Sequence, residues 1–412
     1  MIKLIDKIYS KKYDGIFEII TILGIKIKKK CLKKQFEKLE AITNRFMFNS
    51  FQRNQTIKIL AENRSYPECI EDKLKKITKS PKYLFVDQRH NYLNYLLGFD
   101  QIKYTGDIEL DSAYLSWEIR PEKYIIDILN FALNVNKEVL FVGDSFLRSI
   151  DTMANDKAEE KYVKGISFTF DDLTSYFDAT QPSRMELLLN DKNLVITEEQ
   201  RQRARRCIDR IIETHLTKYN HQPIYEPEIG RKGVKKVLVV DQSYGDMSIL
   251  KGWGSDETFE KMLNKAIEEN PEADIIVKTH PDTMTGNRGG YYTGLKQHDN
   301  IYTQTTPINP ISLIKYVDKV YVCSTQFGFE ALMCGKEVHV FGMPFYAGWG
   351  LTIDDQKCER RTNTRTLEEM FYIAYIMYSY YVNPETKAPC EIEDAMDYLL
   401  KLRGEYFQKV GK

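Results

Sequence analysis

Between residues 237 and 342, short runs of aliphatic residues alternate regularly with segments of helical pattern. The runs VLVVD, DIIV, KVYV and EVHV are rich in β-branched residues, which favour strands. The segments between them that predict helices are 256–270, with Asp256 as N-cap, 310–317 and 327–334. This alternation predicts an α/β protein with a Rossmann-like parallel sheet.

The chain has 412 residues, more than one hydrophobic core usually serves, so two domains are expected. Prolines and glycines at 223, 227, 230 and 233 mark a linker, which places a domain boundary near 225–235. Thr197 and Gln200 predict a capping box at the start of a long Arg-rich helix before this linker. Another helix is expected from residue 367, with Thr366 as its N-cap, over LEEMFYIAYIMYSYY. The division that we expect is a helical N-terminal region 1–80, a first domain 81–230, a second domain 231–385 and a C-terminal helix 386–412.

Charge and cysteine content exclude several classes of protein. Lys+Arg and Asp+Glu balance at 59 each, so no overall charge points to nucleic acid. Residues 1–40 hold eleven lysines and five acids, which fits either a solvated face or a patch held against anionic lipid. No apolar segment is long enough to span a membrane, and the seven scattered cysteines form no CxxC pair. We therefore expect a cytoplasmic protein with reduced thiols.

The strand VLVVD leads into a polar turn that carries Asp241, Gln242 and Asp246. Ligands of open α/β sheets lie beyond the carboxyl ends of the strands, so this turn is expected to face a reaction cleft. A carboxylate there could serve as a nucleophile, a base or a metal ligand. Acidic residues elsewhere come as adjacent pairs, and no histidine pair has ligand spacing, so no metal is expected.

Two further strand exits carry polar groups suited to a phosphate. Lys278 and His280 leave the strand DIIV in the sequence KTHPD, although a lone histidine is often only a satisfied polar residue. The segment STQFGFE opens a helix, whose first N–H groups can bind an anion. Its candidate ligand-binding residues are Ser324, Thr325 and Gly328, with Glu330 within reach of ribose hydroxyls. An ordinary strand–helix unit would look the same.

Two other segments contain side chains suited to a sugar substrate. Arg148, in GDSFLRS, could bind a substrate carboxylate with its guanidinium or form a structural ion pair. The loop MPFYAGWGL places Tyr346 and Trp349 among glycines, where the two rings could stack on a base or a sugar.

Taken together, these segments resemble the capsule polysaccharide synthesis family whose members are β-Kdo glycosyltransferases. The resemblance covers about two thirds of the chain, from residue 139 to 400. Its matching strings are FLRS, YFDATQPSRMELLLND, THLTKYN, VLVVDQSYGDMS, VKTHPD with GGYY, STQFGFEALMCGK and FGMPFYAGWGLT.

The resemblance implies a GT-B-like fold, with two Rossmann-like domains and a cleft between them. It implies CMP-β-Kdo as the donor, bound by the second domain, retention of configuration and no metal or other cofactor. The nucleophile is implied to be Asp246, supported by Asp241 and Gln242. The remaining implied roles are electrostatic help to the departing phosphate from His280, nucleotide binding by Gln326 and Glu330, and binding of the donor carboxylate by Arg148 or Arg288.

One departure from the family pattern affects the acceptor side. Where members usually show E-D-G, this chain has Gly143-Asp144-Ser145, so Asp144 becomes the candidate base and the acceptor or linkage could differ. The chain carries one copy of the motif set, which predicts one linkage. The expected acceptor is a glycolipid or polysaccharide at the inner face of the inner membrane, beside other capsule-synthesis proteins. The alternatives are another CMP-ulosonate or a pentofuranose donor, or a non-catalytic partner in capsule assembly or export.

Overall fold

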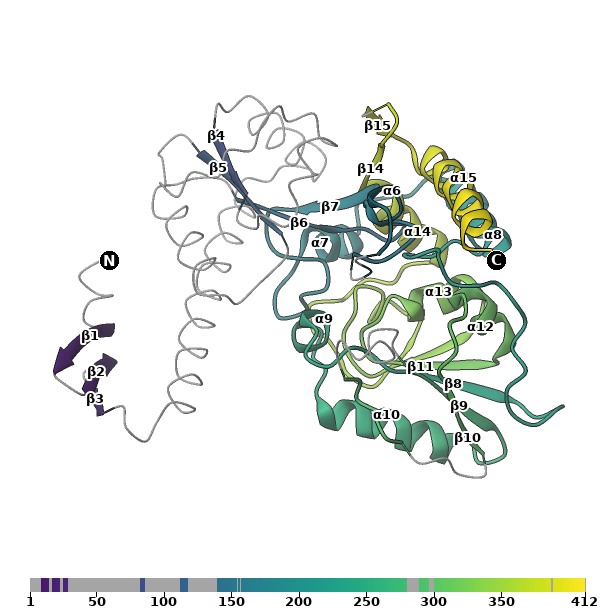
Figure 1. The fold of residues 1–412 in the computed structure, drawn as a ribbon, viewed down its shortest axis with the longest axis horizontal. Helices are drawn as coiled ribbons and strands as arrows, with labels where there is room; N and C mark the ends of the chain where they lie inside the picture. The colour runs from purple at the N-terminus through teal and green to yellow at the C-terminus, as the bar shows by residue number, and fades with distance from the viewer. Residues whose placement is uncertain are drawn as a thin grey trace.

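The computed structural model describes residues 139–411 apart from 154, 156, 280–288, 296–299 and 387. Nearer the N-terminus it describes the backbone of five strands. The strands form two six-stranded sheets and one three-stranded sheet. Figure 1 shows the two larger sheets one above the other, with helices around both.

The second domain is built on a sheet whose six strands are all parallel, in the order β10-β9-β8-β11-β12-β13. The strands are β8 (Lys236–Val240), β9 (Asp274–Lys278), β10 (Ile301–Gln304), β11 (Lys319–Val322), β12 (Glu337–Val340) and β13 (Ile353–Asp354). Taken in chain order, this is the 3-2-1-4-5-6 arrangement of a Rossmann sheet. The order reverses between β8 and β11, so the predicted ligand-binding turns lie on either side of the switch point.

Helices cover both faces of this parallel sheet. Side chains of a strand alternate between faces, and here Val237 and Val239 pack with α10 while Leu238 and Val240 join the core shared with α12 and α13. The helices are α9 (Met247–Lys251), α10 (Asp256–Glu269), α12 (Pro310–Tyr316) and α13 (Phe327–Met333). The N-cap of α10 is Ser255, in a capping box with Thr258, and not Asp256 as expected.

The first domain has a mixed sheet in the order β15-β14-β7-β6-β5-β4. Its strands are β4 (Lys82–Phe85), β5 (Ser112–Trp117), β6 (Val139–Asp144), β7 (Ser167–Asp171), β14 (Ser379–Asn383) and β15 (Ala388–Cys390). Strands β4, β5 and β6 run parallel, whereas β7, β14 and β15 each pair antiparallel with their neighbours. Only one half of this sheet therefore has the parallel pairing of a Rossmann-like domain.

The C-terminal part of the chain returns to the first domain. The helix expected over residues 367–381 is shorter: α14 (Leu367–Phe371) continues into a π-helical turn, η3 (Tyr372–Met377), and residues 379–383 become β14. Because Tyr381 pairs with Ser167 of β7, the chain rejoins the first sheet before residue 385, where the sequence placed the end of the second domain.

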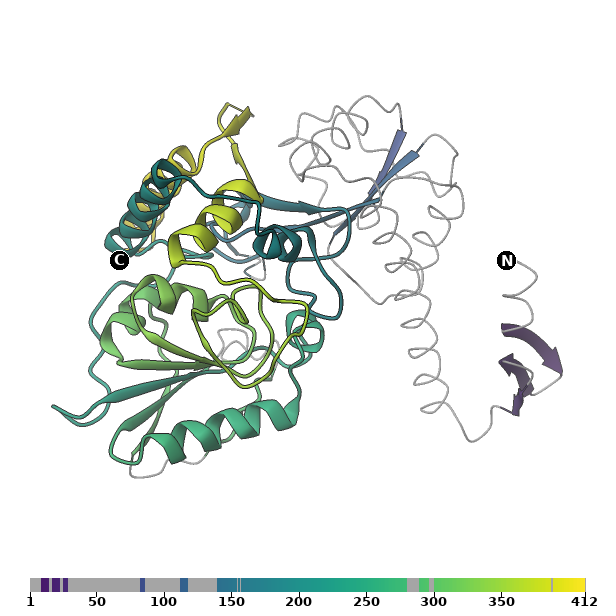
Figure 2. The same ribbon diagram turned by 180° about the vertical axis from the view of Figure 1, so that it is seen from behind.

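Two long helices flank this returning segment. The last helix, α15 (Ile392–Val410), lies beside α8 (Glu198–Thr214), as the view from behind shows (Figure 2). Arg203 of α8 bonds Glu391 at 2.6 Å and Glu393 at 2.7 Å. The capping box of Thr197 and Gln200 at the start of α8 confirms that prediction. The shorter helices of this domain are α6 (Glu160–Val163) and α7 (Arg184–Asn190).

Near the N-terminus the structure differs from the expected helices. Residues in β1 (Tyr9–Asp14), β2 (Phe17–Ile22) and β3 (Ile25–Lys28) form an antiparallel sheet. The run FEIITI of β2 is rich in β-branched residues, which favour strands. The predicted lysine-rich surface lies outside the described side chains. Among the residues that the structure describes, no helix has both the length and the apolar character needed to cross a lipid bilayer.

Candidate active site

Asp241 joins the turn after β8 to a second segment of the chain. Its buried carboxylate accepts N–H bonds from Gln242 at 2.8 Å, Tyr291 at 2.9 Å and Tyr292 at 3.4 Å. Burial raises the pKa of this carboxyl, and the backbone N–H bonds act in the opposite direction. Tyr244 N–H also donates to Gly289 O at 2.8 Å. The GGYY segment and the turn therefore form one hydrogen-bonded unit.

Gln242 connects the two strand exits at the switch point. Its Nε2 donates to Ser324 Oγ at 3.2 Å, and its Oε1 accepts the Ser324 N–H at 2.9 Å. Both residues are buried. The amide thus joins the turn after β8 to the start of α13 through two hydrogen bonds.

Asp246 ends the same turn and is the N-cap of α9. Its Oδ1 accepts from Ser248 N–H at 2.8 Å and from Ser248 Oγ at 2.7 Å. The residue is partly exposed. Both of these bonds end on one carboxylate oxygen, so the cap fixes the orientation of the group.

Lys278 at the end of β9 and Glu330 in α13 are two ionisable groups whose charges affect each other. Burial lowers the pKa of Lys278 to about 8, while the charges of Glu330 and Asp241 favour its protonated form. Burial raises the pKa of Glu330 to about 7, against hydrogen bonds from the Lys218 backbone and Gln326 and the charge of Lys278. The two side chains thus influence each other through their charges, while Lys278 Nζ donates to Thr279 O at 3.4 Å.

Gln326 reaches across to the first domain. Its Nε2 donates to Phe146 O at 3.0 Å and to Glu330 Oε1 at 3.3 Å. Its Oε1 is buried and has no hydrogen-bond partner among the described residues. A buried acceptor without a donor is costly, so this oxygen is a candidate contact for a ligand hydroxyl or amine.

The start of α13 uses several of its own polar groups internally. Gly328 N–H donates to Thr325 O at 3.3 Å, and Phe327 N–H donates to Thr325 Oγ1 at 3.3 Å. A Cβ at Gly328 would collide with the Tyr346 hydroxyl. Close packing against Tyr346 is one reason for a glycine at this position, and phosphate binding by Gly328 stays a prediction.

The expected stacking roles of Tyr346 and Trp349 are wrong, because both side chains are fully buried. Tyr346 Oη donates to Thr325 O at 2.6 Å, and Trp349 Nε1 donates to Phe345 O at 2.8 Å. The neighbouring Phe345 packs on Phe146 with ring centroids 4.9 Å apart. The aromatic loop therefore belongs to the core that joins the two domains.

Arg148 forms the structural ion pair that the sequence left open, so its guanidinium does not face a donor carboxylate. Its Nε lies 2.7 Å from Asp144 Oδ1, and its side chain is 1% exposed. The same guanidinium bonds Ser149 Oγ and Val163 O, each at 2.8 Å. Asp144 keeps 16% of its side chain exposed. His280 and Arg288 lie outside the described residues.

Sequence reasoning missed two contributors to this region. Lys218, whose backbone N–H bonds Glu330, lies in the string THLTKYN, which carries part of the family resemblance. Tyr244 lies inside the DQSYGD turn, and the structure leaves 56% of its surface exposed. Its position two residues before Asp246, in a polar turn after a strand, is the signal that the sequence offers.

Comparison with known proteins places this arrangement in a family. A family model described as capsule polysaccharide biosynthesis protein matches residues 225–384. The capsule polysaccharide modification protein LipA of Neisseria meningitidis serogroup B is 39% identical over 72% of this chain and 43% of its own length. The lipopolysaccharide-processing protein LpsZ of Rhizobium meliloti is 35% identical over 69% of this chain and 63% of its own length. The chain thus spans less than half of the meningococcal relative.

Two solved structures from Thermosulfurimonas dismutans resemble most of this chain. KpsC β-Kdo 2,4 transferase is 35% identical with a TM-score of 0.70, covering 78% of this chain and 98% of that chain. KpsC β-Kdo 2,7 transferase is 25% identical with a TM-score of 0.56, covering 78% and 99%. The similarity extends across both domains, as expected for a GT-B-like enzyme. The chain therefore belongs to the capsule polysaccharide biosynthesis family.

Proposed function

We propose that this protein is a retaining glycosyltransferase that moves β-Kdo from CMP-β-Kdo to a glycolipid or polysaccharide acceptor. The single observation that carries the proposal is the position of Asp246. It lies at the switch point of the parallel sheet, partly exposed, with its carboxylate oriented by Ser248. The similarity to two Kdo transferases supports the choice of sugar.

The reaction would proceed in two displacements. A carboxylate oxygen of Asp246 attacks the anomeric carbon, the bond to the CMP phosphate breaks, and CMP leaves with the electron pair. An acceptor hydroxyl then attacks the same carbon, its proton passes to a base, and the Asp246 carboxylate is released. Two inversions restore the original configuration. Asp144 is the candidate base, and its ion pair with Arg148 makes that arginine a positioning residue.

Lys278 and Glu330 would bind the nucleotide of the donor. A bound phosphate favours the charged form of Lys278, whose pKa burial otherwise lowers to about 8. Gln326 Oε1, for which the described residues provide no hydrogen-bond partner, would accept a bond from a ribose hydroxyl or from the cytosine amine. His280 and Arg288 remain proposed contacts to the phosphate and the donor carboxylate. Stabilisation of the leaving group by these residues requires no metal ion.

The linkage is proposed to be β-2,4. The chain is more similar to the 2,4 transferase than to the 2,7 transferase, in both identity and TM-score. NMR analysis of the product would identify which hydroxyl has been glycosylated.

We further propose that the reaction takes place at the cytoplasmic face of the inner membrane. The lysine-rich N-terminal segment would lie against anionic lipid there.

Intact-protein mass spectrometry tests the mechanism. With CMP-Kdo and no acceptor, the wild-type protein should gain the mass of one Kdo residue on Asp246. Asp246→Asn should form no adduct and transfer no sugar, yet bind CMP as the wild-type protein does. Asp209→Asn, at an exposed acid on α8 away from the proposed site, serves as the matched control for the adduct assay.

Full transfer by Asp246→Asn would refute the nucleophile. If a different nucleotide sugar forms the adduct and CMP-Kdo forms none, that nucleotide sugar is the donor. An inert protein that binds capsule-synthesis enzymes would favour the non-catalytic alternative.

A further inference from the structure

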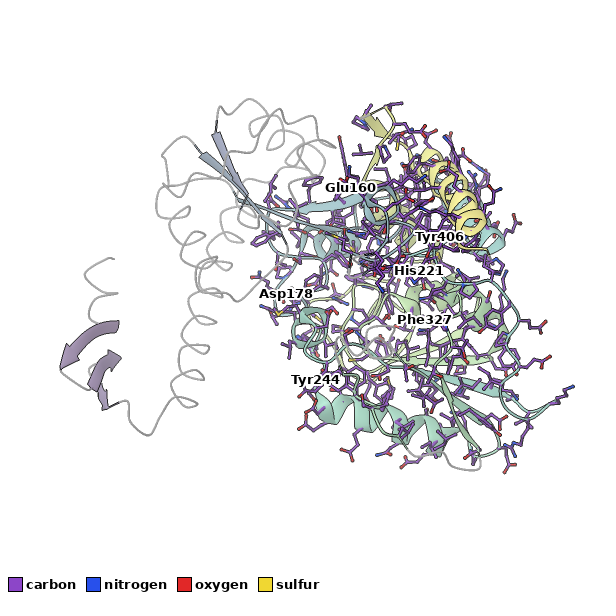
Figure 3. All side chains as sticks on the ribbon, in the orientation of Figure 1. Glu160, Asp178, His221, Tyr244, Phe327 and Tyr406 are labelled. Carbon is purple, nitrogen blue, oxygen red and sulfur yellow. The ribbon has the colours of Figure 1, made fainter. Side chains whose placement is uncertain are left out.

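A pocket of about 450 Å³ lies on the α10 side of the second sheet. Its walls are α10, Tyr244 in the turn after β8, and residues 290–292. In Figure 3, Tyr244 is labelled beside the start of α10, whereas Phe327 of α13 is labelled nearer the first domain. Because α10 and α13 cover opposite faces of the sheet, this pocket is separate from the Glu330 and Lys278 side of the site.

Three aromatic rings form one wall of the pocket. Phe259 and Tyr291 stack with centroids 3.8 Å apart and planes 3° apart. Tyr244 lies against Tyr291 at 5.0 Å, tilted by 40°, and is 56% exposed. A large exposed ring on a packed base presents its apolar face to a ligand with little loss of side-chain freedom. The C–H face of a pyranose ring is a suitable partner for such a surface.

The rim of the pocket is polar and carries negative charge. Asp256, Glu260 and Asn264 line it from exposed positions on α10. None of the nine described lining residues is a lysine or arginine. Carboxylates and amides accept bonds from sugar hydroxyls, whereas two carboxylates repel an anionic ulosonate. The chemistry therefore favours a neutral sugar over Kdo.

The turn that carries the proposed nucleophile also contributes Tyr244 to the wall of the pocket. Tyr244 and Asp246 belong to one turn, and the Tyr291 N–H is bonded to Asp241 of that turn at 2.9 Å. Tyr244 N–H bonds Gly289 O, which holds the exposed ring next to Tyr291. A ligand in the pocket would thus contact the same turn from the side opposite α13.

We propose that this pocket is a saccharide-binding subsite that holds a neutral sugar ring of the acceptor, away from the hydroxyl that reacts. The assignment to the acceptor rests on the proposed transferase function, whereas the assignment to a neutral sugar rests on the pocket alone. Tyr244 provides the stacking face, and Asp256 and Glu260 accept bonds from the sugar hydroxyls.

Saturation-transfer NMR with methyl β-galactopyranoside, methyl α-glucopyranoside and the methyl glycoside of Kdo tests the proposal. At least one neutral glycoside should bind the wild-type protein. Its binding should weaken about tenfold in Tyr244→Ala, which corresponds to about 1.4 kcal/mol, and persist in Tyr244→Phe, which keeps the ring. Tyr225→Ala, at an exposed tyrosine of the linker, is the matched control. Glu260→Lys should weaken binding of the neutral glycoside and strengthen binding of the Kdo glycoside.

The proposal is overturned if neither neutral glycoside binds, or if Tyr244→Ala binds no more weakly than Tyr225→Ala. It is also overturned if the Kdo glycoside competes with the neutral one in the wild-type protein. The adduct assay on the wild-type protein keeps this test separate from the transferase proposal. Absence of a Kdo adduct would refute the proposed transferase mechanism, whereas glycoside binding that depends on Tyr244 would still establish the subsite.

Discussion

The side chain of Gln242 holds Ser324 through two hydrogen bonds across the switch point of the parallel sheet. Its Nε2 donates to Ser324 Oγ at 3.2 Å, and its Oε1 accepts from Ser324 N–H at 2.9 Å. One amide thereby fixes the separation between the turn that carries Asp246 and the start of α13. Since effective catalysis requires reacting groups to be held in one geometry, this link is expected to matter for both stability and activity.

Gln242→Ala should lower the free energy of unfolding by about 1–3 kcal/mol, because it leaves the buried Ser324 N–H without its partner. Gln242→Glu keeps an acceptor for that N–H but loses the donor to Ser324 Oγ, so turnover should fall less than in the alanine variant. Urea unfolding and initial rates with CMP-Kdo would measure both effects. Equal rates in the two variants and the wild-type protein would show that the link has no functional role.

Asp246 has a structural role that can be separated from the proposed chemical one. As N-cap of α9 it accepts from Ser248 N–H, and asparagine caps helices about as well as aspartate does. The free energy of unfolding of Asp246→Asn should therefore lie within a few tenths of a kcal/mol of the wild-type value. Asp246→Ala should lower it by about 1 kcal/mol. Thermal unfolding measures the difference. A large loss of stability in the asparagine variant would mean that the carboxylate charge itself holds the turn.

Much of the second domain could be predicted from sequence, because each aliphatic run between polar turns corresponds to one strand of the parallel sheet. Local patterns also predicted the capping box at Thr197, whose partners lie three residues apart. Patterns of this kind depend on near neighbours, and a single chain displays them directly.

The contacts that sequence misjudged depend on distant segments. Arg148 appeared suited to a substrate, but Val163 and Asp144 surround its guanidinium. Trp349 appeared suited to stacking, but Phe345 accepts its N–H inside the core. The residue types alone do not distinguish a buried ion pair or an aromatic core from a binding site, because the same side chains serve both.

Gly328 and Tyr346 should behave as a coupled pair. A methyl group at Gly328 would meet the Tyr346 hydroxyl first, and next the ring carbon that bears it. Gly328→Ala should cost about 1–3 kcal/mol of stability through overpacking. Adding Tyr346→Phe removes the closest atom, so the double variant should lose less than the sum of the two single losses. A double-mutant cycle by urea unfolding measures this coupling, and strictly additive losses would contradict the packing explanation.

Stability should pass through a minimum near neutral pH because of Glu330 and Lys278. Glu330 has a folded pKa of about 7, above its usual 4.5, so its contribution is present at low pH and is lost as pH rises towards 7. Lys278 has a folded pKa of about 8, below its usual 10.5, so its contribution is present at high pH and is lost as pH falls towards 8. Glu330→Gln should remove the acidic slope, and Lys278→Met the alkaline one. Unfolding free energies measured from pH 4.5 to 10.5 would decide the matter, since slopes unchanged in both variants would assign the pH dependence to other groups.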